Sequence, residues 1–286
     1  MKNTQMPNDD LKFFNNEIWL KNLVNNSFKA IDNGYYEVKN KNDIKNHSII
    51  NLKNSIKNCY HVPLIAEIKF ASPSKGKLVN IENINVETIA YEMEQGNASA
   101  ISILSQPYLF NGSINYILKA RTKTRLPILM KDIIVSDIQI KIARDIGADC
   151  ILLIKTIFDN NLTEGSLEKL SEYAKKLGLQ VIVETHFKKE FEEMVKLNKN
   201  CDAVCDIIGI NNRNLNTLKI DLDVTNSILS SCNKNNNMIL SESGINSTED
   251  ILYLKKSGAD AFLIGSSLME NIDNLRSNIE KLYMSY

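Results

Sequence analysis

The chain has 286 residues and a balanced charge, with 34 Lys and Arg residues against 34 Asp and Glu residues. A chain without net positive charge does not attract the phosphates of a nucleic acid over a distance. The sequence also shows no basic face interleaved with aromatic residues, so we expect no nucleic-acid partner. No apolar run approaches the roughly 20 residues that a membrane helix needs, and the opening segment lacks the apolar core of a signal peptide. We therefore expect a cytoplasmic protein with no membrane partner.

The cysteines are scattered along the chain and partly lie inside apolar runs. There are five of them, at Cys59, Cys150, Cys201, Cys205 and Cys232. An odd, scattered set suits a reducing compartment better than a disulfide framework. Cys201 and Cys205 are four residues apart, but no second pair of Cys or His with metal-ligand spacing accompanies them, so we expect no metal site.

The first 60 residues are rich in Asn and Lys and show helical patterns without a core of their own. Apolar residues recur at helical spacing over Ile18–Ile31, and a second segment covers Ile49–Ile56. We predict an N-terminal helical extension over residues 1–60, followed by one catalytic domain over residues 61–286.

From residue 61 onward, short runs rich in Ile, Leu and Val recur at the spacing of βα units. Eight runs begin near residues 64, 100, 127, 150, 180, 207, 238 and 261, which leaves 23 to 36 residues from each start to the next. Each interval has room for a helix and two short loops. Near-continuous apolar runs indicate parallel strands that are buried on both faces of a sheet.

Helical patterns with polar faces fill the intervals. Examples are Ser136–Ile146, with Ser136 or Asp137 as a candidate N-cap, and Thr248–Lys256. Gly-Ala-Asp stands between a helix and a strand twice, at 147–149 and 258–260, which is a sign of a repeated unit. Eight such units predict an α/β fold with a single (β/α)8 TIM barrel. A doubly wound open sheet is the alternative, but no Gly-rich dinucleotide fingerprint follows the first strand.

The carboxyl ends of these strands, where such barrels build their active sites, are unusually polar. Three carboxylates and three cations end the runs and are expected to face one another: Glu67, Glu184, Glu242, Lys69, Lys131 and Arg213. A structural salt bridge explains any single pair. Six charged groups at one rim would each lose solvation for little net stabilisation, so we predict acid–base chemistry there.

Small residues follow the seventh and eighth strands. Ser243 and Gly244 in one loop, and Gly265 and Ser266 in the other, can offer backbone N–H groups to an anion. Loops at these two places, with a following short helix, form the common phosphate site of TIM barrels, although an ordinary pair of turns has the same composition. Together with the rim charges they predict a small phosphorylated substrate, handled without a metal or redox cofactor.

The chain over residues 63–271 resembles indole-3-glycerol-phosphate synthase, a barrel enzyme of tryptophan biosynthesis. The resemblance rests on motifs that occur in order and at barrel spacing: AEIKFASPSKG (66–76), ILMKD (128–132), GADCILLI (147–154), VIVETH (181–186), IIGINNRNL (207–215), ILSESGI (239–245) and FLIGSSLM (262–269). It implies a carboxy-lyase that closes the indole ring of 1-(2-carboxyphenylamino)-1-deoxyribulose 5-phosphate with loss of carbon dioxide and water. We expect a monofunctional enzyme without a cofactor, as a monomer or weak homo-oligomer.

The resemblance also implies roles for the catalytic residues. By position in the motifs, Lys131 resembles the general acid that protonates the substrate ketone. Glu184 resembles the group that assists the later deprotonation and dehydration, with Lys69 as its partner near the leaving hydroxyl. Glu67 and Glu242 would position the lysines and bind substrate hydroxyls, while Asn211 would orient the substrate.

A second group of residues is expected to bind the substrate and its phosphate. The resemblance assigns this role to Ser72, Arg213, Ser243, Gly244, Leu263, Gly265 and Ser266, with Arg213 as partner of Glu67 or of the substrate carboxylate. The loop that contains Ser72, Lys75 and Gly76 is a candidate lid over the site.

Several positions depart from the family pattern. Ile133 stands where the family usually has the Phe that packs on the substrate's aromatic ring, so we expect a looser ring pocket or one filled by Phe70 or another side chain. Phe70 stands where a basic residue is common, and Asn214 replaces the usual Asp. The segment from Ser105 to Pro107 lacks the usual Thr-acid pair. None of these positions is the proposed acid or base.

Other functions remain open from the residues alone. Phosphoribosylanthranilate isomerase or the tryptophan synthase α subunit would share the last two strand ends, but would not be expected to carry AEIK, MKD and NNR together. A Schiff-base aldolase would use Lys131 or Lys69 as nucleophile, although the rim acids oppose the lowered lysine pKa that it needs. A barrel that binds a phosphorylated metabolite or a partner protein without turnover would be favoured by a broken acid or base position, and both positions are intact.

Overall fold

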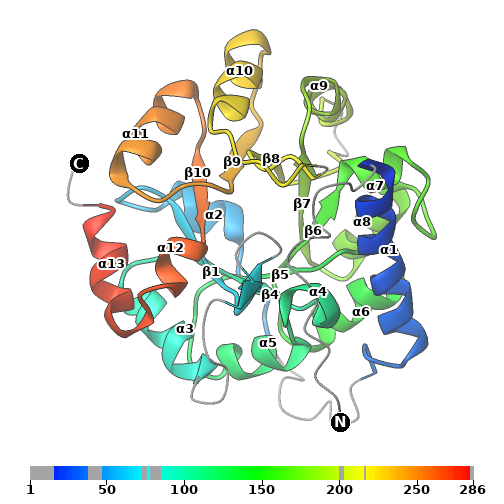
Figure 1. Cartoon of the computed structure of the whole chain (residues 1–286), viewed down its shortest axis with the longest axis horizontal. Coiled ribbons are helices and arrows are strands. Elements are labelled where there is room, and N and C mark those ends of the chain that lie inside the picture. Colours follow the sequence, from blue (N-terminus) through cyan, green and yellow to red (C-terminus); the bar gives the residue numbers. More distant parts are fainter. Residues whose placement is uncertain are drawn as a thin grey trace.

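Eight parallel strands close into a barrel, and helices form a ring around it (Figure 1). The computed structural model describes residues 16–37, 47–72, 76–77, 85–199, 203–215 and 217–283. The barrel strands are β1 (Leu64–Ile68), β4 (Ala100–Leu104), β5 (Ile128–Lys131), β6 (Cys150–Ile154), β7 (Gln180–Thr185), β8 (Ile207–Asn211), β9 (Met238–Glu242) and β10 (Ala261–Ile264). All eight coincide with the predicted runs, which confirms the (β/α)8 barrel.

The helices around the barrel alternate with the strands. They are α3 (Val86–Gln95), α4 (Pro107–Phe110), α5 (Ile114–Arg121), α6 (Asp137–Asp145), α7 (Lys155–Asp159), α8 (Leu167–Lys176), α9 (Lys188–Leu197), α10 (Asp223–Ser231), α11 (Thr248–Ser257), α12 (Ser266–Met269) and α13 (Leu275–Lys281), with a 3-10 turn at Ile272–Asn274. Directly after β1, the short strands β2 (Ala71–Ser72) and β3 (Gly76–Lys77) pair antiparallel.

Local sequence explains where the helices begin and end. Ser136 caps α6 and forms a reciprocal capping box with Gln139, which confirms Ser136 as the N-cap and leaves Asp137 as the first helical residue. α11 begins after Ser247 with the same kind of box and ends at Gly258, whose φ of 109° is a conformation that L side chains rarely adopt.

The repeated Gly-Ala-Asp sequence has a structural cause. Asp149 stands before β6 and accepts a hydrogen bond from the backbone N–H of Ile128, the first residue of the neighbouring β5, at 2.7 Å. Asp260 before β10 does the same for Ile239 of β9 at 2.8 Å. Each carboxylate thus pairs a strand N–H that would otherwise end the ladder unsatisfied.

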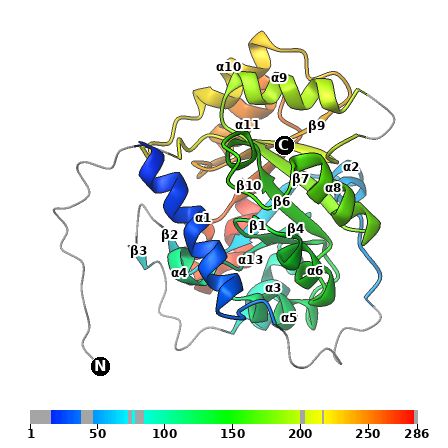
Figure 2. The same cartoon turned by 90° about the vertical axis from the view of Figure 1, so that its right-hand side faces the viewer.

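The N-terminal helices lie at opposite ends of the barrel (Figure 2). α1 (Asn16–Asp32) lies at the end where β2 and β3 follow the first strand, and α2 (Leu52–Lys57) lies at the amino ends of the strands. Both predicted helical segments are therefore confirmed. Their buried side chains, including Leu23 and Leu52, belong to the same hydrophobic core as the barrel.

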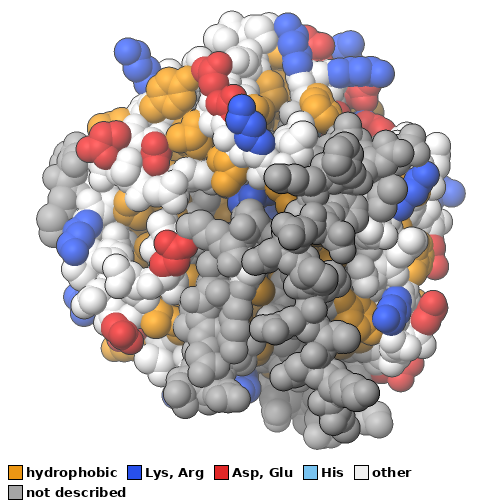
Figure 3. All heavy atoms as spheres, in the orientation of Figure 1, with side chains coloured by type: hydrophobic (Ala, Val, Ile, Leu, Met, Phe, Trp, Pro, Cys, Tyr) orange, Lys and Arg blue, Asp and Glu red, His pale blue; other side chains and the backbone are white. Residues whose placement is uncertain are grey.

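The barrel is seen from the carboxyl ends of its strands in Figure 1, and Figure 3 shows the same face with all atoms. Lys or Arg side-chain atoms are visible near the centre of this face, with hydrophobic side chains around them. Because charged groups are rarely surrounded by apolar ones unless they have partners or a function, this centre is a candidate site.

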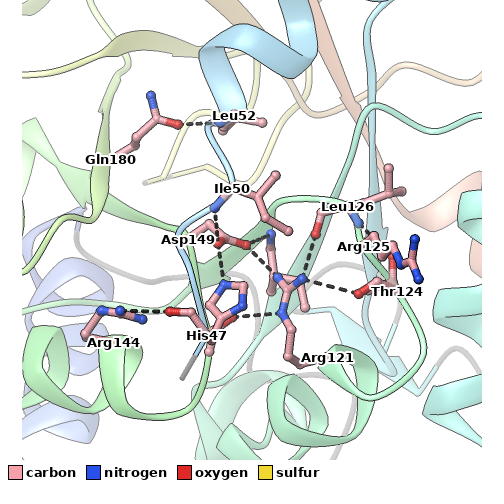
Figure 4. A network of polar contacts seen from close by, with 12 residues as sticks. His47, Ile50, Leu52, Arg121, Thr124, Arg125, Leu126, Arg144, Asp149 and Gln180 are labelled. Atoms are coloured by element: carbon pink, nitrogen blue, oxygen red, sulfur yellow. Dashed lines mark hydrogen bonds and ion pairs between the residues drawn. The ribbon is translucent and has the colours of Figure 1, made fainter. Parts of the chain in front are cut away.

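Asp149 also ties the N-terminal segment to the amino ends of the strands (Figure 4). Its Oδ1 lies 2.6 Å from His47 Nε2 and accepts from the backbone N–H of Ile50 at 2.8 Å. Arg121 Nη2 donates to the other oxygen at 2.5 Å. The carboxylate is fully buried and fully paired, so this network clamps residues 47–50 beneath the barrel.

Candidate active site

A pocket of about 220 Å³ opens at the carboxyl ends of the strands. Its polar lining comes from the ends of seven strands and the loops that follow them: Glu67, Lys69, Gln106, Lys131, Asp132, Glu184, Asn211, Arg213, Ser243, Asn246 and Ser266. Among the predicted site residues whose side chains the structure describes, all except Glu242 line this pocket. The pocket thus brings together residues that are up to about 200 positions apart in the sequence.

Two lysines and three carboxylates form one charged array. Lys69 Nζ lies 2.9 Å from Glu67 Oε1. Lys131 Nζ lies 2.5 Å from Glu242 Oε2 and 3.6 Å from Glu184 Oε2. Lys131 is therefore held between carboxylates from β7 and β9, with its ammonium group at the pocket wall.

Glycines make room for two of these carboxylates. A Cβ atom on Gly209 would come within 2.5 Å of Glu242 Oε1, and one on Gly265 within 2.6 Å of Glu67 Oε1. Glu242 is fully buried and does not line the pocket, because it lies behind Lys131. The geometry therefore allows Glu242 to position Lys131, but not to bind substrate hydroxyls in this conformation.

The array sets the protonation of its members. Burial by itself lowers the pKa of Lys131, but Glu242, Glu184 and Glu67 outweigh it and raise that pKa. Burial raises the pKa of Glu242 to about 7, against the opposing effect of Lys131. For Glu184, the opposing effects of Lys131 and His186 exceed that of burial and lower the pKa to about 2. At neutral pH, Glu184 is thus an ionised carboxylate beside a charged lysine.

A buried hydrogen-bond network stands behind the next residue, Asp132. Its Oδ2 accepts from Tyr36 Oη at 2.9 Å and from Ser105 Oγ at 2.6 Å, and Gln139 donates to the same tyrosine at 3.1 Å. Burial raises the pKa of Asp132 to about 6, against the effect of these donors. Tyr36 follows α1, so this network links the N-terminal segment to the residue beside Lys131. Tyr36 was not predicted as part of the site, because no pattern in the sequence around it indicates this contact.

Hydrophobic side chains cover the other side of the pocket. Trp19 and Leu23 from α1, Phe110 from α4 and Ile133 line it. Phe70 does not: it is 1% exposed and packs edge-on against Tyr116, with ring centroids 5.1 Å apart. Phe70 therefore does not line this pocket, and among the described residues Trp19 and Phe110 are the aromatic side chains that do.

The candidate phosphate loops border the same pocket. Ser243 and Gly244 both have positive φ angles, 71° and 83°. The backbone after β9 therefore turns through two consecutive residues in the left-handed region, unlike the backbone of a helix. Leu263, Gly265 and Ser266 line the pocket beside them. Arg213, also at the pocket, donates through Nη1 to the Leu218 carbonyl at 3.2 Å, and Asn211 Oδ1 accepts from the Arg213 N–H at 2.9 Å.

Some predicted features lie outside the described residues. These are Lys75 of the candidate lid, Cys201 and the side chain of Ser72. Cys205 is buried and free. Within the described ranges, no group of three or more His, Cys, Asp and Glu side chains is arranged to hold a metal ion, and no helix is long and apolar enough to span a membrane.

Fold and site together define a barrel enzyme with a lysine and carboxylate array at its mouth. The family model for indole-3-glycerol phosphate synthase matches residues 21–282. A relative of that name from Methanocaldococcus jannaschii is 40% identical over 261 residues, which are 91% of each chain, and one from Campylobacter fetus is 41% identical over 79% of this chain and 80% of its own. The chain belongs to the indole-3-glycerol phosphate synthase family, so it is a carboxy-lyase of tryptophan biosynthesis that acts on a phosphorylated small molecule.

Solved structures show the fold alone. A mutant tryptophan synthase α-subunit from Pyrococcus furiosus superposes with a TM-score of 0.53 at 15% identity, over 78% of this chain and 98% of that one. The N-acetylmannosamine-6-phosphate 2-epimerase from Clostridium perfringens gives a TM-score of 0.55 at 15% identity, over 82% of this chain and 99% of that one. The similarity to the tryptophan synthase α-subunit, one of the alternatives above, is thus a similarity of barrels.

Proposed function

We propose that the pocket at the carboxyl ends closes the indole ring of 1-(2-carboxyphenylamino)-1-deoxyribulose 5-phosphate, with Lys131 as general acid and Glu184 as general base. The observation that carries this proposal is the position of Lys131 Nζ, which lies at the pocket wall between Glu184 and Glu242. The wall thus presents an acid and a carboxylate to the same substrate.

The first step forms the carbon–carbon bond. The aromatic carbon that bears the carboxylate attacks the ketone carbon, and Lys131 gives a proton to the ketone oxygen, which becomes a hydroxyl. Loss of the carboxylate as carbon dioxide returns the bonding electrons to the ring and restores its aromaticity. An ammonium group beside the developing alkoxide stabilises the charge that appears there.

The second step removes water. Lys69 protonates the hydroxyl, which leaves as water, and Glu184 accepts the proton that the five-membered ring loses. Two protons are given and one is accepted, so each turnover takes up one proton, as loss of a carboxylate as carbon dioxide requires. Glu67, 2.9 Å from Lys69 Nζ, positions that lysine.

The array couples the two steps. The positive charge of Lys131 holds the pKa of Glu184 low in the resting site, which makes Glu184 a weak base at that stage. When Lys131 gives up its proton, that charge disappears and the proton affinity of Glu184 rises. Glu184 therefore becomes an effective base after the first step, when the reaction needs one.

The remaining lining residues would bind the rest of the substrate. The backbone around Ser243, Gly244, Gly265 and Ser266 would hold the phosphate, with Leu263 and Ser72 beside it. Trp19, Phe110 and Ile133 would enclose the aromatic ring. Asn211 would orient the ribulose part, and Arg213 would pair with the substrate carboxylate, since a guanidinium group binds a carboxylate through two hydrogen bonds.

The catalytic unit would include the N-terminal extension over residues 1–60 as well as the barrel over residues 61–286, because Trp19 and Leu23 line the pocket. The enzyme would act in the cytoplasm as a monomer or weak homo-oligomer. Free cysteines at 59, 150, 205 and 232 support a reducing compartment.

The test is fluorescence-monitored formation of indole-3-glycerol phosphate by the wild-type chain and by Glu184→Gln. We expect the wild type to turn over and Glu184→Gln to lose about a hundredfold or more in kcat, the usual scale for a general base. Borohydride treatment with substrate should leave no lysine adduct. A wild type that binds the substrate without forming an indole, or a trapped adduct, would contradict the proposal.

A further inference from the structure

His186 lies directly behind Glu184 and has no part in the reaction described above. It follows Glu184 by two positions at the end of β7, and its side chain is only 3% exposed. An imidazole cut off from water must satisfy both ring nitrogens with protein groups. The identity of those groups fixes where its protons are.

Polar groups from three elements surround the ring. Nε2 lies 3.1 Å from Glu184 Oε1, in an ion-pair contact without the straight alignment of a strong hydrogen bond, and makes no hydrogen bond with any other described residue. On the other side of the ring, Nδ1 lies 3.3 Å from Thr156 Oγ1 of α7 and 4.0 Å from Glu190 Oε2 of α9.

Thr156 decides the proton on Nδ1. A threonine hydroxyl has one hydrogen, and Thr156 gives it to Glu190 Oε1 at 2.7 Å. It therefore presents a lone pair to His186, so Nδ1 must carry a hydrogen to make a favourable contact. Glu190 is fixed in turn by the backbone N–H of His186, which donates to its Oε2 at 2.7 Å.

Glu184 decides the proton on Nε2. An ionised carboxylate can only accept, so an unprotonated Nε2 at 3.1 Å would set two lone pairs against each other. Both nitrogens are thus required to carry hydrogen, and the ring is then an imidazolium cation between two glutamates.

We propose that His186 is a doubly protonated positioning residue that orients Glu184, holding Oε1 so that Oε2 faces Lys131 and the pocket. This proposal rests on the base role of Glu184 given above. The two oxygens have separate neighbours, since Glu184 Oε2 is the atom 3.6 Å from Lys131 Nζ. A carboxylate held in this way cannot rotate to present its other oxygen to the substrate.

The charges around the ring support the cationic form. Glu184, Glu190 and Glu242 are the carboxylates that act on His186, with Lys131 beyond Glu184. On α7, Lys155 is paired with Asp159 and Glu193. Burial lowers the pKa of His186, but the carboxylates outweigh burial and raise it above its ordinary value. The cation is therefore present below that raised pKa and is lost as the pH increases through it.

The charge of His186 can be measured without any turnover. The chain has three histidines, so ¹⁵N NMR of histidine-labelled protein, compared with the spectrum of His186→Gln, assigns the signal. We expect both ring nitrogens of His186 to be protonated at pH 7 in the free enzyme. A single protonated nitrogen at that pH would overturn the proposal, whatever the activity of the chain.

Kinetics test the effect on Glu184. His186→Gln keeps a neutral N–H donor near the place of Nε2, and His186→Leu removes it. We expect kcat to fall about tenfold in His186→Gln, because the carboxylate of Glu184 is then held less firmly in its productive orientation, and further in His186→Leu, with KM within about twofold of the wild type. In the wild type kcat should decrease as the pH passes the NMR midpoint of His186, and this decrease should be absent in His186→Gln.

His61→Gln is the matched control, because His61 is exposed, stacks on Tyr283 and lies before β1, away from the pocket. It should keep the wild-type kcat and pH profile. A decrease of kcat at the same pH in His186→Gln as in the wild type, or normal kcat in His186→Leu, would contradict the positioning role. If the wild type formed no indole at all, the proposed function would fail, and NMR would still decide the charge of His186.

Discussion

Lys131 and the carboxylates around it depend on one another for their charge. Lys131 contacts Glu242 and Glu184, and the two acids differ in pKa because one lies behind the lysine while the other is also beside His186. Residue types at strand ends predicted this array. They did not distinguish the pKa of Glu184 from that of Glu242. This difference depends on burial and on His186, which lies two positions after Glu184, and neither effect can be read from the end of a single strand.

Asp132 gives a prediction about pH at the residue scale. Its pKa is raised from 3.8 to about 6 in the fold, so the folded chain binds more protons than the unfolded chain between these values. Its contribution to stability is therefore present at low pH and is lost as the pH rises from about 4 to about 6. The loss would be up to about 3 kcal/mol for a shift of this size.

The measurement is urea unfolding of the wild type and Asp132→Asn at several pH values. Across this range the free energy of unfolding of the wild type should decrease relative to that of the variant, because Asn does not titrate. A difference between the two proteins that stays constant from pH 4 to pH 7 would contradict the raised pKa.

At the scale of elements, the amino ends of the strands predict unequal effects for two similar aspartates. Asp149→Asn would leave Arg121, 8% exposed, without its buried partner and should lower the free energy of unfolding by about 3 kcal/mol or more. Asp260→Asn is the matched control: its partner Lys234 is 31% exposed, so the cost should be about 1 kcal/mol. Equal losses in urea unfolding would show that the buried network does not clamp the N-terminal segment.

α1 gives a prediction about substrate binding. Trp19 borders the pocket, so Trp19→Ala should raise KM about tenfold, as for the loss of about 1.4 kcal/mol of binding, and leave kcat nearly unchanged. Tyr91→Ala is the control, because Tyr91 is an exposed aromatic residue of α3 outside the pocket lining. Unchanged KM in Trp19→Ala would mean that α1 does not contact the substrate.

At the scale of the whole molecule, the sequence predicted the barrel closely and the site in part. The eight strands were predictable because each is a local apolar run, and the rim residues because they end those runs. Trp19 and Tyr36 were missed, since both lie roughly 100 positions before Asp132, and Phe110 was missed because it lies in the short helix α4, where no local pattern indicates a contact with the pocket. The role of Asp149 was seen only as a repeated motif, because its partners come from three separate parts of the chain.

The most direct test of the account is the effect of Lys131→Ala on kcat and on the dissociation constant of the substrate, with Lys234→Ala as an ion-paired lysine outside the pocket. If Lys131 is the acid for ring closure, its loss should lower kcat by about a hundredfold or more and change substrate binding by less than about threefold. Lys234→Ala should keep the wild-type values of both. A Lys131→Ala variant that closes the ring at nearly the wild-type rate would show that the acid is another group.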